Sequence, residues 1–144
     1  MNTALLPQSP QPKTTCPLAA SGVYRQNRVI GGSNPLSNSN PLSHTFVFTT
    51  NSLGQVSNTY SWGNNGFTGV WVQNAREDIS AANQALGSNY ALNRVGGTGL
   101  LGNIQTAFDI LNSVSSEVHG NGGITSNCKT EADNLIATGN SIGH

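Results

Sequence analysis

The sequence has few charged side chains, and their balance limits the partners of the protein. Of 144 residues, six are Lys or Arg and six are Asp or Glu, so charged residues make up 8% of the chain and the formal net charge is zero. An average soluble domain carries about 25% charged residues. Because the basic residues are scattered and too few to neutralise many phosphates, the composition argues against nucleic acid or an anionic membrane surface as the main partner.

A long apolar run is also missing. No segment approaches the 18 or more apolar residues of a membrane-spanning helix, and the N-terminus has neither a basic start nor a continuous apolar stretch. We therefore expect no membrane span and no classical signal peptide. With 19 Asn and 16 Ser, the surface is neutral and polar, as is more usual outside the cytoplasm. We expect secretion without a classical signal peptide, as a delivered effector, or a cytoplasmic location.

Residues that bind metals are scarce. The chain has two cysteines, Cys16 and Cys128, and three histidines, without a C-x-x-C, H-x-x-x-H or acidic cluster among them. The sequence therefore predicts neither a metal site nor a cofactor. In an oxidising compartment the two cysteines would form one disulfide, whereas in the cytosol they would be free. Both alternatives stay open at this level.

Proline divides the chain. The length suits a single domain with its own core, and all six prolines lie in the first 43 residues. We predict an irregular Pro-, Asn- and Ser-rich arm over residues 1–43, with short extended pieces at 22–25 and 28–30. Residues 44–144 then form a compact α+β domain that carries the chemistry.

Two β-rich runs follow the arm. Residues 45–50 and 55–62 are separated by a turn sequence that contains Asn and Gly, which predicts a β-hairpin. A third run over residues 67–72 is placed to pair beside it. Matching the apolar faces of the two hairpin strands puts His44 and Asn58 on the same side of the sheet.

Helical periodicity dominates the second half of the chain. Apolar spacing predicts a short helix over residues 79–86, a long helix over 103–118 and a final helix from 128 to near 139. The Gly-rich segment 96–102 lacks the Lys-Ser or Lys-Thr of a phosphate-binding loop, and we interpret it as a flexible connector. The predicted fold is α+β, with a small, hairpin-based antiparallel sheet packed against two or three helices.

Cys128 stands where a helix begins. Asn127 directly before it is suited to cap that helix, and a thiol in the first turn lies in the positive end of the helix dipole, which favours the thiolate. Cys128 also continues an apolar stripe through Ala132, Leu135 and Ile136, so packing in the core is the rival interpretation.

A Cys/His hydrolase needs a thiolate, a histidine that exchanges its proton and a polar group that orients the histidine. Cys128 as nucleophile, His44 as base and then acid, and Asn58 as the orienting group meet this requirement; Thr59 or Ser61 are alternatives for the third position. Backbone N–H groups at the start of the final helix would stabilise an oxyanion.

Other residues have simpler interpretations. His119 competes with His44 as the base. Asp78 is expected to cap its helix, while Glu131 and Asp133 are expected on a solvated helix face. The aromatic side chains are expected in the core rather than on a ligand-stacking surface: Tyr60, Trp62, Phe67 and Trp71.

A family resemblance rests on two segments. Residues 44–48 start a hairpin strand with a histidine, and Asn127-Cys128-Lys129 starts a later helix. In this order they resemble the circularly permuted papain-like hydrolases, which include lecithin:retinol acyltransferase-like proteins and permuted relatives of NlpC-type peptidases. The resemblance covers about residues 44–138 and implies a permuted papain-like fold with Cys128 as nucleophile and His44 as base. The polar residue of the second strand is often His in that family, and Asn58 stands in its place here.

The leading arm and the compact domain behind it are similar to the variable C-terminal toxin domains of bacterial polymorphic (Rhs- or VgrG-associated) effectors. That similarity implies cell-to-cell delivery and an immunity protein as a partner. We therefore predict a cysteine-dependent hydrolase or acyltransferase that acts on an amide or ester bond of a peptide, peptidoglycan or lipid. The alternative is a non-catalytic binding or structural module whose cysteines are buried or disulfide-bonded.

Overall fold

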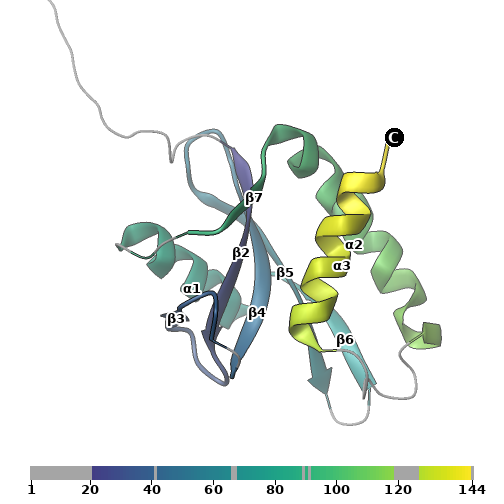
Figure 1. Ribbon diagram of the computed structural model, residues 1–144, viewed down its shortest axis with the longest axis horizontal. Coiled ribbons are helices and arrows are strands. Elements are labelled where there is room, and N and C mark those ends of the chain that lie inside the picture. Colours follow the sequence, from purple (N-terminus) through teal and green to yellow (C-terminus); the bar gives the residue numbers. More distant parts are fainter. Residues whose placement is uncertain are drawn as a thin grey trace, which may run out of the picture.

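The computed structural model describes residues 21–40, 42–65, 68–88, 90, 92–118 and 127–143. Cys16, Phe67 and His119 lie outside the described residues. The strands are β2 (Gly22–Val29), β3 (Pro35–Leu36), β4 (Ser43–Thr50), β5 (Val56–Asn65), β6 (Thr68–Gln73) and β7 (Arg94–Gly96). The helices are α1 (Arg76–Gly87), α2 (Thr98–Val118) and α3 (Cys128–Ser141), as Figure 1 shows. The predicted α+β class is confirmed.

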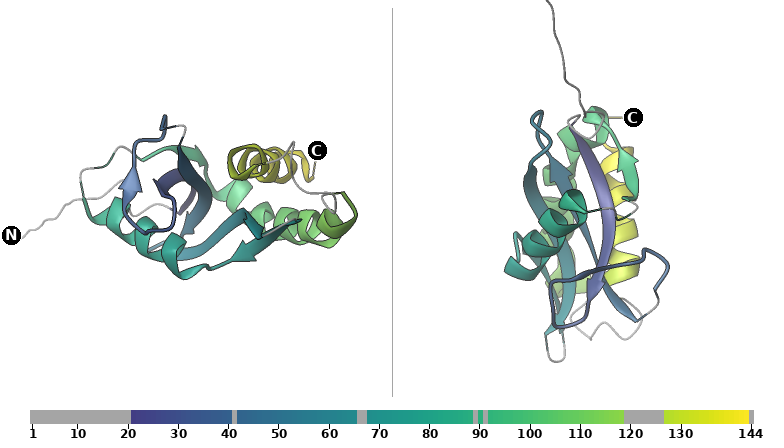
Figure 2. Two further views of the ribbon diagram at one scale, coloured as in Figure 1. Left: turned by 90° about the horizontal axis from the view of Figure 1, so that it is seen from below. Right: turned by 90° about the vertical axis from the view of Figure 1, so that its left-hand side faces the viewer.

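The strands form one antiparallel sheet with helices on both faces. The order is β3-β2-β4-β5-β6, and β7 also pairs with β2. Helix α1 lies on one side of the sheet, whereas α3 lies on the other with α2 beside it (Figure 2). Since both faces are covered, the middle strands are buried along most of their length.

The predicted hairpin is confirmed as β4 and β5. The side-chain oxygen of Asn51 accepts hydrogen bonds from the backbone N–H groups of Leu53 (2.9 Å) and Gln55 (3.0 Å), which closes the turn. Gly54 has a φ of 77°, a left-handed conformation that costs glycine little. Strand β6 pairs with β5 and so provides the predicted third strand.

Each face of the sheet has its own core. The core under α1 contains Tyr24, Phe46, Phe48, Ala81 and Ala82. The larger core under α2 and α3 contains Val23, Val47, Tyr60, Trp62, Trp71, Leu100, Ile104, Ala107, Phe108, Ala132 and Leu135. The prediction that the aromatic side chains are in the core is confirmed for Tyr60, Trp62 and Trp71, which are at most 7% exposed.

Helix α3 starts and packs as its sequence indicates. The side chain of Asn127 accepts a hydrogen bond from the backbone N–H of Thr130 at 2.9 Å, which confirms the predicted cap. Further along, a Cβ atom on Gly139 would lie 2.6 Å from Leu100 Cδ1. The glycine therefore allows α3 to approach α2 closely, and this contact fixes the position of α3 over the sheet.

Two of the predicted boundaries are wrong. The extended pieces expected at 22–25 and 28–30 belong to one strand, β2, and β3 follows it, so this part of the predicted arm joins the sheet, because Val23 and Tyr24 have apolar surface that the two cores bury. The Gly-rich segment 96–102 is not a connector: β7 ends in it and α2 begins in it at Thr98. Burial of Leu100 in the larger core outweighs the cost of glycine in a helix, about 1 kcal/mol per residue.

Candidate active site

The candidate site lies where α3 begins, against the first residues of β4. The backbone N–H of Thr45 donates a hydrogen bond to Cys128 Sγ at 3.3 Å, and the thiol lies 3.8 Å from the carbonyl oxygen of Ser43. Cys128 is half-buried and free of disulfide bonding to any described residue. The capped start of the helix therefore holds the sulfur atom at the end of a central strand.

His44, in β4, interacts with both the thiol and a carboxylate. Its Nε2 lies 3.5 Å from Asp78 Oδ1, at the outer limit for a hydrogen bond, and this nitrogen has no closer partner among the described residues. With Nε2 beside the carboxylate, Nδ1 is the ring nitrogen available to Cys128. Burial alone lowers the pKa of His44, but hydrogen bonding to Asp78 and Cys128 and the charge of Asp78 outweigh it and raise that pKa.

Asp78 is a fully buried carboxylate in the first turn of α1. Its Oδ1 accepts a hydrogen bond from Arg28 Nε at 2.7 Å, and its Oδ2 accepts one from Ser61 Oγ at 2.7 Å. Burial raises the pKa of Asp78, yet the hydrogen bonds from His44, Arg28 and Ser61 overcome this effect and lower it. The carboxylate is therefore charged beside the imidazole, which favours the imidazolium form.

The predicted role of Asp78 as a helix cap is wrong. Ala75 occupies the cap position of α1 and makes no side-chain capping bond. Asp78 is three residues further on and faces the sheet, where the Arg28 side chain is only 10% exposed. A buried guanidinium requires a charged partner, and Asp78 provides it.

The thiol of Cys128 has an unusually low pKa. Burial raises this pKa, but hydrogen bonding with His44, the backbone N–H of Thr45 and the positive charges of His44 and Lys129 lower it to about 7. Because each partner changes the protonation of the other, Cys128 and His44 titrate as a coupled pair. These contacts favour the thiolate of Cys128 together with the imidazolium of His44.

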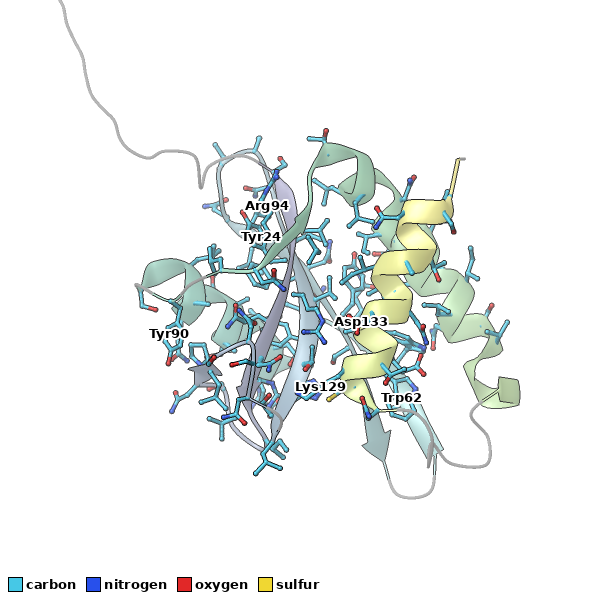
Figure 3. All side chains as sticks on the ribbon, in the orientation of Figure 1. Tyr24, Trp62, Tyr90, Arg94, Lys129 and Asp133 are labelled. Carbon is cyan, nitrogen blue, oxygen red and sulfur yellow. The ribbon has the colours of Figure 1, made fainter. Side chains whose placement is uncertain are left out.

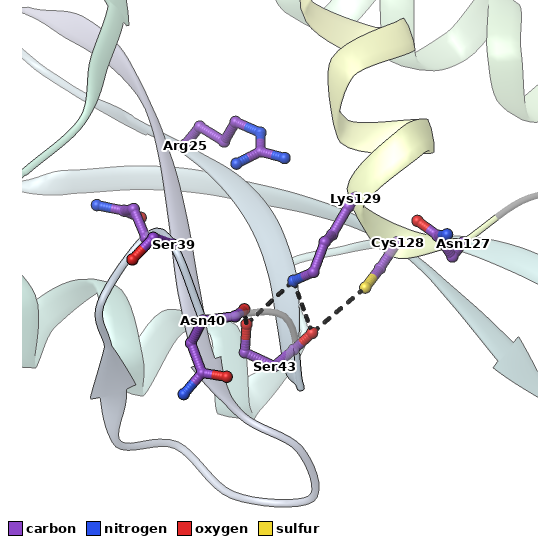
Figure 4. A pocket seen from close by; sticks show the side chains of 8 residues that line it. Arg25, Ser39, Asn40, Ser43, Asn127, Cys128 and Lys129 are labelled. Carbon is purple, nitrogen blue, oxygen red and sulfur yellow. Dashed lines mark hydrogen bonds between the residues drawn. The ribbon is translucent and has the colours of Figure 1, made fainter.

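Lys129 fastens α3 to β4 next to the thiol. Its Nζ donates to the carbonyl oxygen of Ser43 (3.1 Å), to Ser43 Oγ (3.1 Å) and to Thr45 Oγ1 (3.0 Å), as Figure 4 shows for Ser43. No described carboxylate lies within ion-pair distance of this ammonium group. All three acceptors are neutral, so the positive charge of Lys129 acts on the nearby thiol and lowers its pKa.

Asn58 does not reach the candidate site. It lies opposite Thr49, while Thr59 lies opposite Phe48, so Asn58 is on the other face of the sheet from His44. Its Oδ1 accepts hydrogen bonds from Gln73 and Asn74 instead. The prediction that Asn58 shares a face with His44 is wrong, because the cross-strand register differs by one residue from the one we inferred by matching apolar side chains.

Thr59 and Ser61, the two alternatives to Asn58 as the residue that orients His44, lie at different distances along β5 from the candidate site. Thr59 is on the same face as His44 but lies opposite Phe48 in β4. Ser61 is on that face too, and its hydroxyl group donates to the carboxylate of Asp78. Ser61 therefore contacts the residue that contacts His44.

The two predicted surface acids also differ. Glu131 is 1% exposed, so its predicted place on a solvated face is wrong. Asp133 is 65% exposed and forms an ion pair with Arg25 Nε at 2.9 Å. Figure 3 places Asp133 on α3 above Lys129, at the same side of the helix.

Two pockets flank Cys128. Pocket 1 has a volume of about 450 Å³ and is lined by Arg25, Asn38, Ser39, Asn40, Ser43, Asn127, Cys128 and Lys129 (Figure 4). Pocket 2 has a volume of about 470 Å³ and is lined by Arg28, Ile30, Gly31, Ser43, His44, Trp62, Gly63, Asn127 and Cys128. Because both share Ser43, Asn127 and Cys128, the thiol lies between two spaces that together suit an extended ligand.

Trp62, in β5, is one of the residues that line pocket 2. A Cβ atom on Gly69 would lie 1.7 Å from Trp62 Cζ2, so the indole ring lies directly against the backbone of β6. Only a glycine at this position leaves room for the ring. Gly63 beside it has open space where its own Cβ would be.

Sequence reasoning missed Arg28, Asp78 and Lys129 as members of this site. The low number of charged residues could have pointed to these three. In a chain with six basic and six acidic residues, each charged side chain has a high chance of a specific partner. The pairing of Arg28 with Asp78 could not be found in this way, because 50 residues separate them.

The described part of the chain also lacks two other features. It contains no group of three or more His, Cys, Asp or Glu side chains in an arrangement that holds a metal ion. None of its helices is both long enough and apolar enough to cross a membrane.

Comparison with known proteins gave no relative. No family model matches the chain, and no similar curated sequence or solved structure was found.

Proposed function

We propose that this protein is a cysteine-dependent hydrolase or acyltransferase that acts on an amide or ester bond. Cys128 is the nucleophile, His44 the base and then the acid, and Asp78 the residue that orients His44 in place of the expected Asn58. One observation carries the proposal: a thiol at a helix start lines both pockets and lies near a histidine whose Nε2 is 3.5 Å from a buried carboxylate, an arrangement that favours the thiolate.

The reaction has two stages. The Cys128 thiolate attacks the carbonyl carbon of the substrate, and the tetrahedral intermediate expels the amine or alcohol, which takes its proton from the imidazolium of His44. A thioester on Cys128 results. Water, or another nucleophile in an acyl transfer, then attacks the thioester while His44 accepts its proton, and the acid or new acyl product leaves with the Cys128 sulfur returned to its thiolate form.

Charge on the substrate oxygen needs hydrogen-bond donors. The backbone N–H groups of Cys128 and Lys129 are in the first turn of α3, where a helix leaves its N–H groups without partners in the helix. They make no hydrogen bond to the described residues. Together with the helix dipole, they support an oxyanion position next to the sulfur.

The position of Cys128 supports catalysis over the alternative of a binding or structural module. A packing cysteine belongs among apolar side chains, yet the partners of this thiol are polar: His44, the Thr45 N–H and the Ser43 carbonyl oxygen. The thiol also lines both pockets. No specific observation favours the module.

The proposal extends to a delivered bacterial toxin with an immunity protein as partner. Its support is the resemblance of the chain to polymorphic effector domains and the neutral, Asn- and Ser-rich composition. Expression of the wild-type chain and of Cys128→Ala in bacterial cytoplasm and periplasm tests it. Growth arrest by the wild type alone is expected, and equal growth with both proteins would contradict a catalytic toxin.

The nucleophile is tested by alkylation of Cys128 with iodoacetamide in a Cys16→Ser background. The alkylation rate should rise as the pH rises through about 7. At pH 6.5 about a quarter of Cys128 would be thiolate, against about 1% of an ordinary thiol whose pKa is about 8.5. The hydrolysis rate should rise with the same thiol ionisation and fall again as the pH rises through the raised pKa of His44.

A second measurement separates catalysis from simple reactivity. Incubation with p-nitrophenyl acetate should acetylate Cys128, and mass spectrometry should show this thioester disappearing faster in the wild type than in His44→Gln. In His44→Gln the alkylation midpoint should also move up toward 8.5. A wild-type midpoint near 8.5, or a thioester equally stable in both proteins, would contradict the assignment of Cys128 and His44.

A further inference from the structure

Pocket 1 is positively charged. Two cations, Arg25 and Lys129, line it together with Asn and Ser side chains, and no carboxylate is among the lining residues. Pocket 2 differs, because its described lining residues Arg28 and His44 both lie beside the buried carboxylate of Asp78, which offsets their positive charge. The two sides of Cys128 therefore present different electrostatics to a ligand.

Arg25 has hydrogen-bond donors to spare. Its Nε donates to Asp133 Oδ1 at 2.9 Å, while its two terminal nitrogens make no hydrogen bond to the described residues. The side chain is nevertheless only 17% exposed, so these donors face pocket 1 rather than open solvent. Figure 4 shows the guanidinium group of Arg25 directed toward the region of Lys129. A fork of free N–H groups matches the two oxygens of a carboxylate.

Lys129 contributes in another way. Its three protons are committed to Ser43 and Thr45, so the ammonium does not need to contact a ligand directly. Its charge, which no described carboxylate pairs with, still attracts anions into the pocket, and the attraction is strengthened where water is partly excluded. Asp133 acts against this attraction, since its exposed carboxylate neutralises part of the Arg25 charge.

We propose that pocket 1 binds a carboxylate of the substrate through Arg25, so that the protein selects acidic peptides in which this group adjoins the amide bond attacked by Cys128. The inference rests on the proposed function and names its substrate class. Arg25 is a substrate-binding residue in this scheme and takes no part in proton transfer. The two terminal nitrogens of Arg25 donate hydrogen bonds to the two carboxylate oxygens, and the nearby positive charge of Lys129 attracts the carboxylate.

The test compares two alkylating probes, iodoacetate and iodoacetamide, on the full chain in a Cys16→Ser background. Iodoacetate has a carboxylate beside its reactive carbon, whereas iodoacetamide has a neutral amide there. In the wild type, the ratio of the iodoacetate rate to the iodoacetamide rate should exceed that of N-acetylcysteine. Arg25→Gln should lower the ratio roughly fivefold, and Asp133→Asn should raise it, because each removes one charge near the pocket.

Arg76→Gln is the matched control. Arg76 is an exposed arginine that lines neither pocket, so its loss should leave the ratio unchanged. Glutarate and inorganic phosphate are then compared as protectants of Cys128, and glutarate should protect better. An unchanged ratio in Arg25→Gln, or better protection by phosphate, would overturn the carboxylate site.

The failures are distinguishable. A fast iodoacetamide reaction combined with an unchanged ratio would reject the carboxylate site and leave the proposed function standing. A slow iodoacetamide reaction near neutral pH would reject the proposed function, and the carboxylate site with it.

Discussion

Two arginines of β2 meet their acidic partners in different surroundings. Arg28 points toward α1, where its partner Asp78 is fully buried and also contacts Ser61 and His44. Arg25 points toward α3, where its partner Asp133 is 65% exposed. The first pair is satisfied within the protein, while the second leaves the two terminal nitrogens of Arg25 without a hydrogen bond to the described residues. This difference assigns positioning of the imidazole to the Arg28 side and recognition of a ligand to the Arg25 side.

The largest difference between the two ion pairs is expected when the acidic partner is removed from each. Asp78→Ala should lower the free energy of unfolding by about 3–5 kcal/mol, because it leaves the guanidinium of Arg28 buried without a partner. Asp133→Ala should cost less than about 1 kcal/mol, since its pair is exposed. Urea unfolding of both variants measures the difference, and equal losses would contradict it.

The same carboxylate should make stability depend on pH. Because the pKa of Asp78 is lower in the folded protein than in the unfolded chain, its contribution is present above an unfolded value of about 3.9. It is lost as the pH falls through the folded value. In Asp78→Asn this part of the acid sensitivity should disappear, and unfolding midpoints between pH 5 and 3 provide the measurement.

Pocket 2 can be narrowed by a larger side chain at Gly63. A side chain there meets no atom within 4 Å of its Cβ, so Gly63→Leu should fold normally and extend into pocket 2. Alkylation of Cys128 by N-phenylmaleimide should slow about tenfold, while alkylation by the smaller iodoacetamide changes little. Val70→Leu, directly opposite in β6, is the control. Equal slowing by both substitutions would show that the effect does not come from filling pocket 2, and no slowing in Gly63→Leu would show that the reagent does not use this pocket.

A smaller effect is expected at Lys129. Lys129→Gln keeps a hydrogen-bond donor but removes the positive charge that helps to lower the pKa of Cys128. The midpoint of the iodoacetamide profile should rise by about half a pH unit. Arg76→Gln removes an equal charge outside both pockets and should leave the midpoint in place. A midpoint unchanged in Lys129→Gln would mean that this charge is screened from the thiol.

The smallest effect is predicted for Asn58. Since Asn58 bonds Gln73 and Asn74 on the far face of the sheet, Asn58→Ala should leave the pH profile of Cys128 alkylation unchanged. Asp78→Asn should raise its midpoint, because His44 loses the charge that favours the imidazolium. A shift in Asn58→Ala as large as that in Asp78→Asn would restore Asn58 as the orienting residue.

Much of the local structure could be predicted because it depends on neighbours in the chain. The turn between β4 and β5 follows from Asn51 and Gly54, and the start of α3 from the Asn127 cap. Two residues of the candidate site were predicted for the same reason, because each stands at a boundary that the local sequence marks. His44 lies at a strand start and Cys128 at a helix start. Strand β2 was predicted only as two short pieces, at 22–25 and 28–30, since its pairing partner β4 supplies most of what holds it extended throughout.

The sequence by itself determined a thiol at a capped helix start, a histidine at a strand start and a surface with little charge. Only the tertiary structure decided which groups meet them. A one-residue difference in register put Asn58 on the opposite face from His44, and packing of α1 on the sheet brought Asp78 to it from 34 residues along the chain. The physical reason is that side-chain partners across a sheet depend on register and helix docking, which the burial of the two cores fixes together.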